Sequence, residues 1–189
     1  APTSSVEKSA FPKMREAFRD DVSEMVRGTS GQIIITSHMM PDDDATCSAL
    51  AQKRILQSLY PDKKFKIVFS ERKIDAWDDL LQDPSEIVWA KSELGKTAED
   101  KVRQEDIIDY IKGGDALIGL DQGKFSSFTR FENQLKEMGI KTAILDHHQG
   151  DPSVATTSYV EPEATSTCEI IAKMYGPENL SPDVAELLL

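Results

Sequence analysis

The chain has 189 residues, of which 39% are hydrophobic and 29% charged, a composition that supports a sizeable core and excludes a disordered polar tail. Its net charge of −11 argues against a protein that binds long nucleic acid through nonspecific electrostatic attraction, because acidic surfaces repel phosphate. A phosphate substrate is not excluded, since bound divalent cations reverse the local charge inside one cleft.

Neither a membrane span nor a signal peptide is predicted. No apolar run approaches the roughly 20 residues that cross a bilayer, and the chain opens with polar residues. The two cysteines, Cys47 and Cys168, lack the spacing of a metal finger or a disulfide framework. We therefore expect a cytoplasmic protein with reduced thiols and no membrane partner.

The first part of the chain alternates amphipathic helices with short apolar strands. After a polar tail, apolar side chains from Phe11 to Met25 recur at steps of three or four, which predicts a helix ending near Gly28. The next run is β-branched and too short for a helix, so it predicts a buried strand. The elements predicted here are helices over 7–27, 44–59 and 76–81 and strands over 33–36 and 65–69.

The alternation continues to the end of the chain. Further helices are predicted over 97–112 and 126–138, and further strands over 116–120 and 142–145. Ser181 and Pro182 start another helix, which stops at Leu189 with an apolar face and no cap, so we expect a fragment of a longer protein. Strands that are apolar on both faces and alternate with helices predict an α/β fold: an open, mostly parallel β-sheet with helices on both faces.

Three of the predicted strands end in turns rich in aspartate and histidine. In an open parallel sheet the carboxyl ends of the strands lie along one edge, where ligands bind, so these turns are expected to converge. The three turns also contain every histidine of the chain. The candidate residues are His38, Asp42 and Asp44 in the first turn, Asp121 in the second, and Asp146, His147 and His148 in the third.

This set of side chains favours a metal site. Imidazole and carboxylate together bind borderline divalent ions such as Mn²⁺, Co²⁺ or Zn²⁺, and cations would offset the repulsion among so many carboxylates. Two ions about 3.5–4 Å apart, with a hydroxide placed for in-line attack on phosphorus, would fit. Taken alone, Asp44 is as readily a helix N-cap, a single loop histidine is more often structural, and Asp43 is expected to be a solvated neighbour.

Together these motifs resemble the DHH phosphoesterase superfamily over about residues 30–189. The family pattern His-x-x-Pro-Asp-x-Asp-Ala, followed by a helix with Ser, is matched over 38–48, its strand-end Asp by Asp121, and its Asp-His-His motif over 146–148. The stretch 161–169 is similar to a segment of the branch that includes bacterial nano-RNases and pAp phosphatases.

The resemblance divides the chain into two parts. An N-terminal tail and helix would occupy residues 1–29, and the DHH catalytic domain residues 30–189. That domain would be incomplete at its C-terminal end, because the family's fourth motif, an Asp, would follow Leu189. The second ion would then lack a ligand, and the fragment by itself is expected to bind metal incompletely and to be inactive. The C-terminal substrate-binding domain would also be absent.

The resemblance implies a centre of two Mn²⁺ ions, with Co²⁺ and Mg²⁺ as alternatives. His38 and Asp42 would hold one ion, and Asp44 and His147 the second. Asp121 would bridge the two ions.

The resemblance also implies roles around the metal centre. Asp146 would orient its neighbour, and His148 would face the substrate as a phosphate contact or as general acid for the leaving group. These two are the expected catalytic residues. Ser166 and Thr167 would shape the substrate side.

The implied activity is manganese-dependent hydrolysis of phosphoester bonds in a small nucleotide, either a short oligonucleotide or a nucleoside bisphosphate, by a hydroxide that two metal ions activate. Two alternatives stay open: an inorganic pyrophosphatase or exopolyphosphatase on the same core, and a catalytically incomplete metal-dependent binding domain. Short nucleic acid is compatible with the charge and long nucleic acid is not expected. A homodimer is also left open.

Overall fold

The computed structural model describes residues 5–38, 41–70, 79–91, 106–121, 131–148 and 155–188. The strands in this part are β1 Gln32–Thr36, β2 Lys64–Ser70, β3 Ile87–Lys91, β4 Ala116–Leu120, β5 Lys141–Asp146 and β6 Thr157–Val160. The α-helices are α1 Ser5–Gly28, α2 Asp43–Leu59, α4 Glu132–Glu137, α5 Thr167–Tyr175 and α6 Pro182–Leu188. Three short 3₁₀ helices are η2 Pro84–Glu86, η4 Ile107–Tyr110 and η5 Pro177–Asn179.

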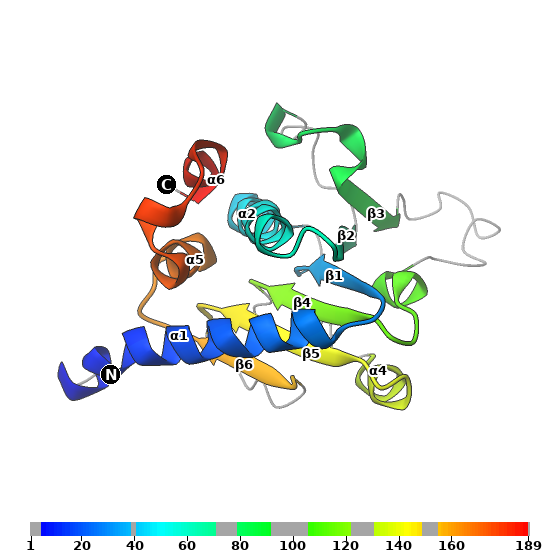
Figure 1. Cartoon of the computed structure of the whole chain (residues 1–189), viewed down its shortest axis with the longest axis horizontal. Coiled ribbons are helices and arrows are strands. Elements are labelled where there is room, and N and C mark those ends of the chain that lie inside the picture. The colour runs from blue at the N-terminus through cyan, green and yellow to red at the C-terminus, as the bar shows by residue number, and fades with distance from the viewer. Residues whose placement is uncertain are drawn as a thin grey trace.

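The six strands pair in parallel to form one open sheet in the order β3-β2-β1-β4-β5-β6. The chain builds outward from β1 to β3, then returns to place β4 on the other side of β1 (Figure 1). The strand order therefore reverses between β1 and β4. In doubly wound sheets, the crevice at the carboxyl ends of two such strands is where ligands bind.

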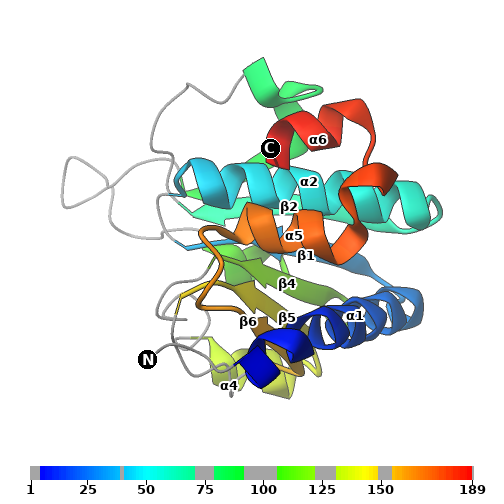
Figure 2. The same ribbon diagram turned by 90° about the vertical axis from the view of Figure 1, so that its left-hand side faces the viewer.

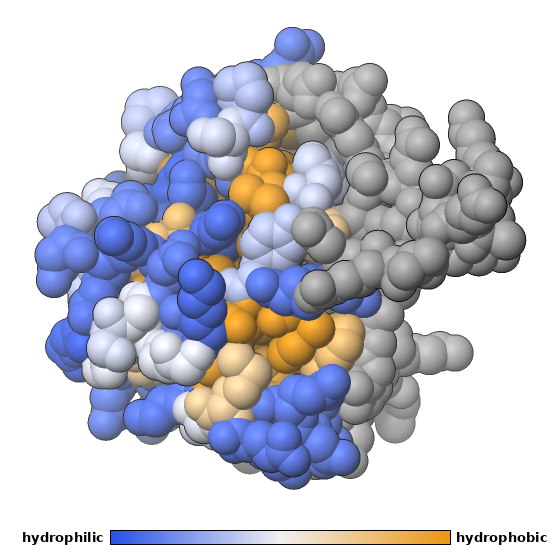
Figure 3. Space-filling model, turned by 90° about the vertical axis from the view of Figure 1, so that its right-hand side faces the viewer, coloured by the Kyte–Doolittle hydropathy of each residue, from blue (hydrophilic) through white to orange (hydrophobic). Residues whose placement is uncertain are grey.

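Helices cover both faces of the sheet, as predicted. In Figure 1, α1, α2, α5 and α6 lie on one side of the sheet, and η4 and α4 lie on the other. The strand β1 shows why both faces are covered: Ile33 and Ile35 join the core under the first group, whereas Ile34 joins the core under the second. Viewed from the side of η4 and α4, apolar side chains reach the surface among hydrophilic ones (Figure 3).

Helix α1 is an integral part of the first layer. Its apolar stripe buries Phe18, Val22, Met25 and Val26, and each such side chain contributes about 1.5–3 kcal/mol to folding when it is withdrawn from water. The helix packs against β6 and α5, and Figure 2 shows it lying along the sheet below α5. No helix in the described part of the chain is long and apolar enough to cross a membrane.

The structure confirms the four predicted strands and adds two edge strands that the sequence did not reveal. The edge strand β6 is only partly buried, and its residues Thr157 and Ser158 interrupt the apolar pattern on which a strand prediction depends. The other edge strand, β3, has only five residues and follows η2 directly.

Two helix predictions need correction where the residues are described. The helix expected over 97–112 is wrong from residue 107 onward, because Asp106 and Asp109 form a capping box that starts the single 3₁₀ turn η4, and the chain is extended again at Ile111. Of the helix expected over 76–81, residues 79 and 80 are in a 3₁₀ turn and residue 81 is not helical. The helix expected over 126–138 is confirmed as the shorter α4. Residues 76–78, 97–105 and 126–130 lie outside the described residues.

Candidate metal centre

The turn between β1 and α2 contains the first candidate ligands. Asp42 is the N-cap of α2, and its Oδ1 accepts a hydrogen bond from the Ala45 amide at 2.9 Å. The same oxygen lies 3.6 Å from His38 Nε2. The idea that Asp44 caps this helix is wrong, because α2 begins at Asp43 and Asp44 lies in its first turn. Asp43 is exposed, as expected for a solvated neighbour.

Asp121 occupies the turn after β4, at the point where the strand order reverses. Its φ of 53° lies in the left-handed region, and its amide donates a hydrogen bond to Leu145 O on the neighbouring strand β5. The side chain is only 2% exposed. Its Oδ2 lies 3.6 Å from His38 Nε2 and its Oδ1 lies 3.4 Å from His147 Nε2. One buried carboxylate thus faces histidines that follow two different strands.

The third turn is organised around Asp146, which is fully buried at the end of β5. Its Oδ1 accepts hydrogen bonds from the amides of His147 and His148, at 2.7 and 3.1 Å, and lies 2.8 Å from His148 Nδ1. A carboxylate at this position favours the His148 tautomer that has its proton on Nδ1. The His148 side chain is 46% exposed, so its ring is fixed at one nitrogen and accessible to solvent.

Asp44 turns toward helix α5. Its Oδ2 accepts a hydrogen bond from the Thr167 amide and its Oδ1 accepts one from the Cys168 amide, both at 3.0 Å. Asp44 Oδ2 also lies 3.6 Å from His147 Nε2. The first turn of α5 therefore holds both oxygens of this carboxylate, and the positive end of the helix dipole favours its negative charge.

The electrostatics of the cluster favour a bound cation. Burial raises the pKa of Asp121 above its usual range, a hydrogen bond from His38 opposes the rise, and the neighbouring carboxylates of Asp44, Asp42 and Asp146 add to it. A divalent cation would offset this repulsion. The donor atoms within each of two sets lie within 4.8 Å of one another; the sets are His38, Asp42 and Asp121, and Asp121, Asp146, His147 and His148. Carboxylate oxygens and imidazole nitrogens in this number fit borderline divalent ions.

All the acidic and histidine residues singled out from the sequence come together at this edge of the sheet. The remaining two candidates lie at the start of α5. Ser166 is the N-cap, with its Oγ accepting the Glu169 amide at 3.1 Å. Thr167 is fully buried, and its Oγ1 lies 3.5 Å from Asp121 Oδ1.

The contacts between Asp44 and α5 were missed by the sequence reasoning. The only available signal was the helix-start pattern at Ser166, which says that a helix begins but not what its amides meet.

The structure is a doubly wound α/β domain with histidines and aspartates at its switch point, which is the place where such folds bind ligands. The chain matches the family model described as the DHH family, N-terminal domain, over residues 32–189. The chain therefore belongs to the DHH family and contains its N-terminal domain. A search of curated proteins gives no match.

Solved structures that are similar to the chain include the following two. An exopolyphosphatase-related protein from Bacteroides fragilis has a TM-score of 0.68 at 19% identity, covering 91% of this chain and 48% of that one. Exonuclease RecJ bound to manganese has a TM-score of 0.47 at 13% identity, covering 92% of this chain and 41% of that one. The first similarity supports the fold alone. The chain spans less than half the length of either protein.

Proposed function

We propose that this chain is the metal-binding part of a phosphoesterase that hydrolyses a small nucleotide, either a short oligonucleotide or a nucleoside bisphosphate, with Mn²⁺ as its cofactor. The observation that carries the proposal is the position of Asp121. Its Oδ1 lies 3.4 Å from His147 Nε2 and its Oδ2 lies 3.6 Å from His38 Nε2, so each oxygen faces a different histidine, as expected of a carboxylate that bridges two ions.

The remaining candidate ligands divide between the two sides of Asp121. His38 and Asp42 would hold one ion, and Asp44 and His147 the other, in keeping with the two groups of short distances. When bound, the ions would supply Lewis-acid stabilisation of phosphoryl charge and a lowered pKa for water. The protein contributes a buried carboxylate on a residue whose amide is hydrogen-bonded to Leu145 O.

His148 is the proposed contact to the substrate. Its Nδ1 is engaged by Asp146, so Nε2, at the far side of the ring, is the nitrogen that can meet a phosphate or transfer a proton to the leaving oxygen. Asp146 fixes both the ring orientation and the tautomer. This pairing assigns His148 a catalytic role and Asp146 a supporting one.

The net charge of −11 supports a small substrate rather than long nucleic acid, because an extended acidic surface repels a polyanion.

A reducing, cytoplasmic setting is also part of the proposal. Both cysteines are free thiols. Burial raises the pKa of the Cys168 thiol, and the charge of Asp44 and a hydrogen bond with this residue raise it further. The Cys168 thiol is therefore unreactive.

The test is a substrate panel on the complete protein loaded with Mn²⁺, with Mg²⁺ and Co²⁺ in parallel, because the chain spans less than half the length of either similar structure. Release of mononucleotide or phosphate from a dinucleotide or from 3′-phosphoadenosine 5′-phosphate is the expected result, and Asp121→Asn is the inactive control. Hydrolysis of pyrophosphate or polyphosphate alone would replace the proposed substrate class. Metal binding without turnover on any of these would overturn the catalytic proposal in favour of a binding domain.

A further inference from the structure

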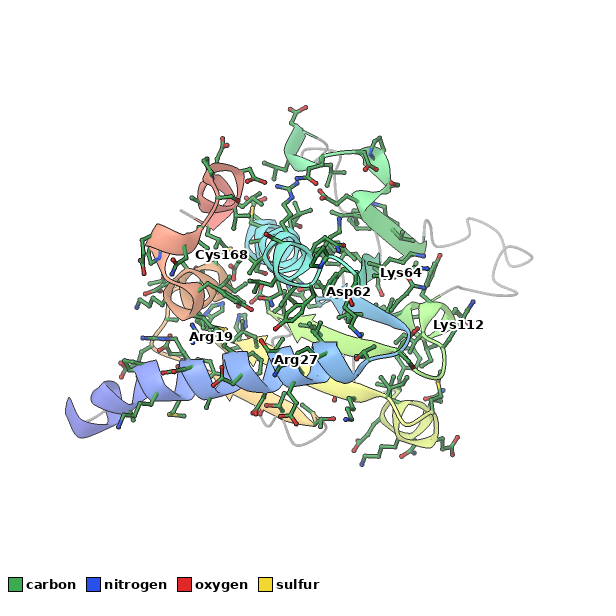
Figure 4. The ribbon with its side chains drawn as sticks, in the orientation of Figure 1. Arg19, Arg27, Asp62, Lys64, Lys112 and Cys168 are labelled. Carbon is green, nitrogen blue, oxygen red and sulfur yellow. The ribbon has the colours of Figure 1, made fainter. Side chains whose placement is uncertain are left out.

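Helix α1 precedes the residues that match the family model. It nevertheless contacts the chain both before the start of α5 and near the end of α5. Before α5, Arg15 Nη1 donates to Glu161 Oε1 at 2.7 Å. In the last turn of α5, Arg19 Nη1 donates to Met174 O at 3.0 Å. Figure 4 shows Arg19 reaching from α1 toward α5, with Arg27 toward the other end of α1.

The first of these contacts is a buried ion pair. Glu161 is 3% exposed, and its Oε1 also accepts a hydrogen bond from the Tyr159 hydroxyl at 3.0 Å. Its Oε2 has no hydrogen-bond partner among the described residues. The Glu161 amide donates to Asp146 O, which joins this residue to the end of β5. Because burial limits screening by water, Arg15 restrains Glu161 strongly.

At its other side, α5 holds the candidate ligands. Two successive amides at the start of α5, those of Thr167 and Cys168, donate to the two oxygens of Asp44. The Thr167 hydroxyl lies 3.5 Å from Asp121 Oδ1. A carboxylate bound by two adjacent amides of a helix must follow any rotation or shift of that helix.

We propose that Arg15 and Arg19 are positioning residues of the metal centre, which fix α5 against α1 and thereby set the orientation of Asp44. The proposal rests on the proposed function in that Asp44 is taken as a metal ligand. Groups that orient ligands from outside the coordination sphere affect metal affinity because the ligands otherwise lose their alignment. Helix α1 is then part of the metal site, although it contributes no ligand.

The sharpest test is Arg19→Met, because this side chain is partly exposed and its loss should leave the fold intact. We expect Mn²⁺ to bind the 189-residue variant about 3- to 10-fold more weakly by calorimetry. Hydrogen exchange at the Thr167 and Cys168 amides should become faster. Arg19→Lys should restore most of the affinity, since lysine can still donate to Met174 O.

The matched control is Arg27→Met, on the same helix and with the same change of charge. The Arg27 side chain has no hydrogen bond or ion pair within the described residues, so its replacement should change affinity by less than about twofold. Equal effects in the two variants would mean that long-range charge, not α5, is responsible, and would overturn the proposal.

For Arg15 the informative variant is Arg15→Met combined with Glu161→Gln, because the single change leaves a buried charge unpaired and threatens folding. The double variant should also weaken Mn²⁺ binding. For comparison, Thr167→Val removes a hydroxyl next to Asp121 itself and should weaken Mn²⁺ binding by about tenfold. Unchanged affinity in Arg19→Met and in the pair would overturn the inference while leaving the metal centre standing. A wild-type chain that binds no divalent ion would overturn the proposed function itself.

Discussion

The two ends of strand β4 carry two buried aspartates with opposite surroundings. Asp115, at the amino end, has both oxygens satisfied by backbone amides, from Gln32 at 2.8 Å and Lys112 at 2.9 Å. Asp121, at the carboxyl end, faces histidines and other carboxylates, and its backbone is in the left-handed region. Asp115 therefore has a structural role at one end of β4, whereas Asp121 is a candidate metal ligand at the other end.

The backbone at Gly31 is packed closely against Asp115 and Gly114. The Gly31 amide donates a hydrogen bond to Gly114 O, and a Cβ at Gly31 would collide with Asp115 Oδ1 and come within 3.0 Å of the Gly114 carbonyl. Only glycine fits there. A buried acid that has amide partners stabilises a fold, whereas one that has acidic neighbours needs a cation.

The comparison of Asp115 with Asp121 is tested most strongly at Asp121, where a substitution is expected to have the largest effect on Mn²⁺ affinity. Replacing it with asparagine keeps the size and tolerates a positive φ but removes the charge. We expect Mn²⁺ affinity to fall by about 1,000-fold, or roughly 4 kcal/mol, measured by calorimetry. Asp43→Asn, an exposed neighbour with the same charge change, is the control. A loss below about tenfold would contradict the bridging role.

Asp115→Ala should produce the reverse pattern. Two buried amides lose a charged acceptor, so the free energy of unfolding should fall by about 3 kcal/mol, measured by urea denaturation. Metal affinity of the folded fraction should stay within about twofold, because the site lies at the other end of the strand. A stable Asp115→Ala with weakened metal binding would show that the two ends of β4 are not independent.

His148→Ala should separate catalysis from metal binding. If the proposed function holds, turnover should fall by about 100-fold, the lower range for losing a positioned acid or phosphate contact. Metal affinity should change by less than about threefold, in contrast to Asp121→Asn. Equal loss of metal in the two variants would undo this division of roles.

The smallest expected effect is on the pH dependence of stability without metal. Because the folded state raises the pKa of Asp121, the folded chain binds a proton more tightly than the unfolded chain does. This group's contribution is therefore most favourable below its unfolded pKa and is lost as the pH rises through the folded pKa. Urea denaturation between about pH 4 and 7 should show a smaller decline for Asp121→Asn than for the wild type. An identical slope would contradict the burial argument.

Much of the fold follows from local patterns. The strands β1, β2, β4 and β5 lie inside the sheet and are nearly continuous apolar runs, so the sequence predicts them. The edge strand β6 was missed because a half-exposed strand need not be apolar. At η4 the apolar residues Ile107 and Ile111 are buried, but capping by Asp106 starts one 3₁₀ turn in place of the predicted helix.

The sequence alone determined the order of the strands along the chain and the acidic and histidine-rich turns that end three of them. Parallel pairing then brings those turns to one edge, so the convergence of His38, Asp121 and His147 could be predicted. Only the tertiary structure decided how Asp44 is held, because its partner Thr167 lies 123 residues away, and Arg15 and Glu161 are 146 residues apart. Periodicity reveals which face of a segment is buried, whereas sheet order and helix packing decide which faces meet.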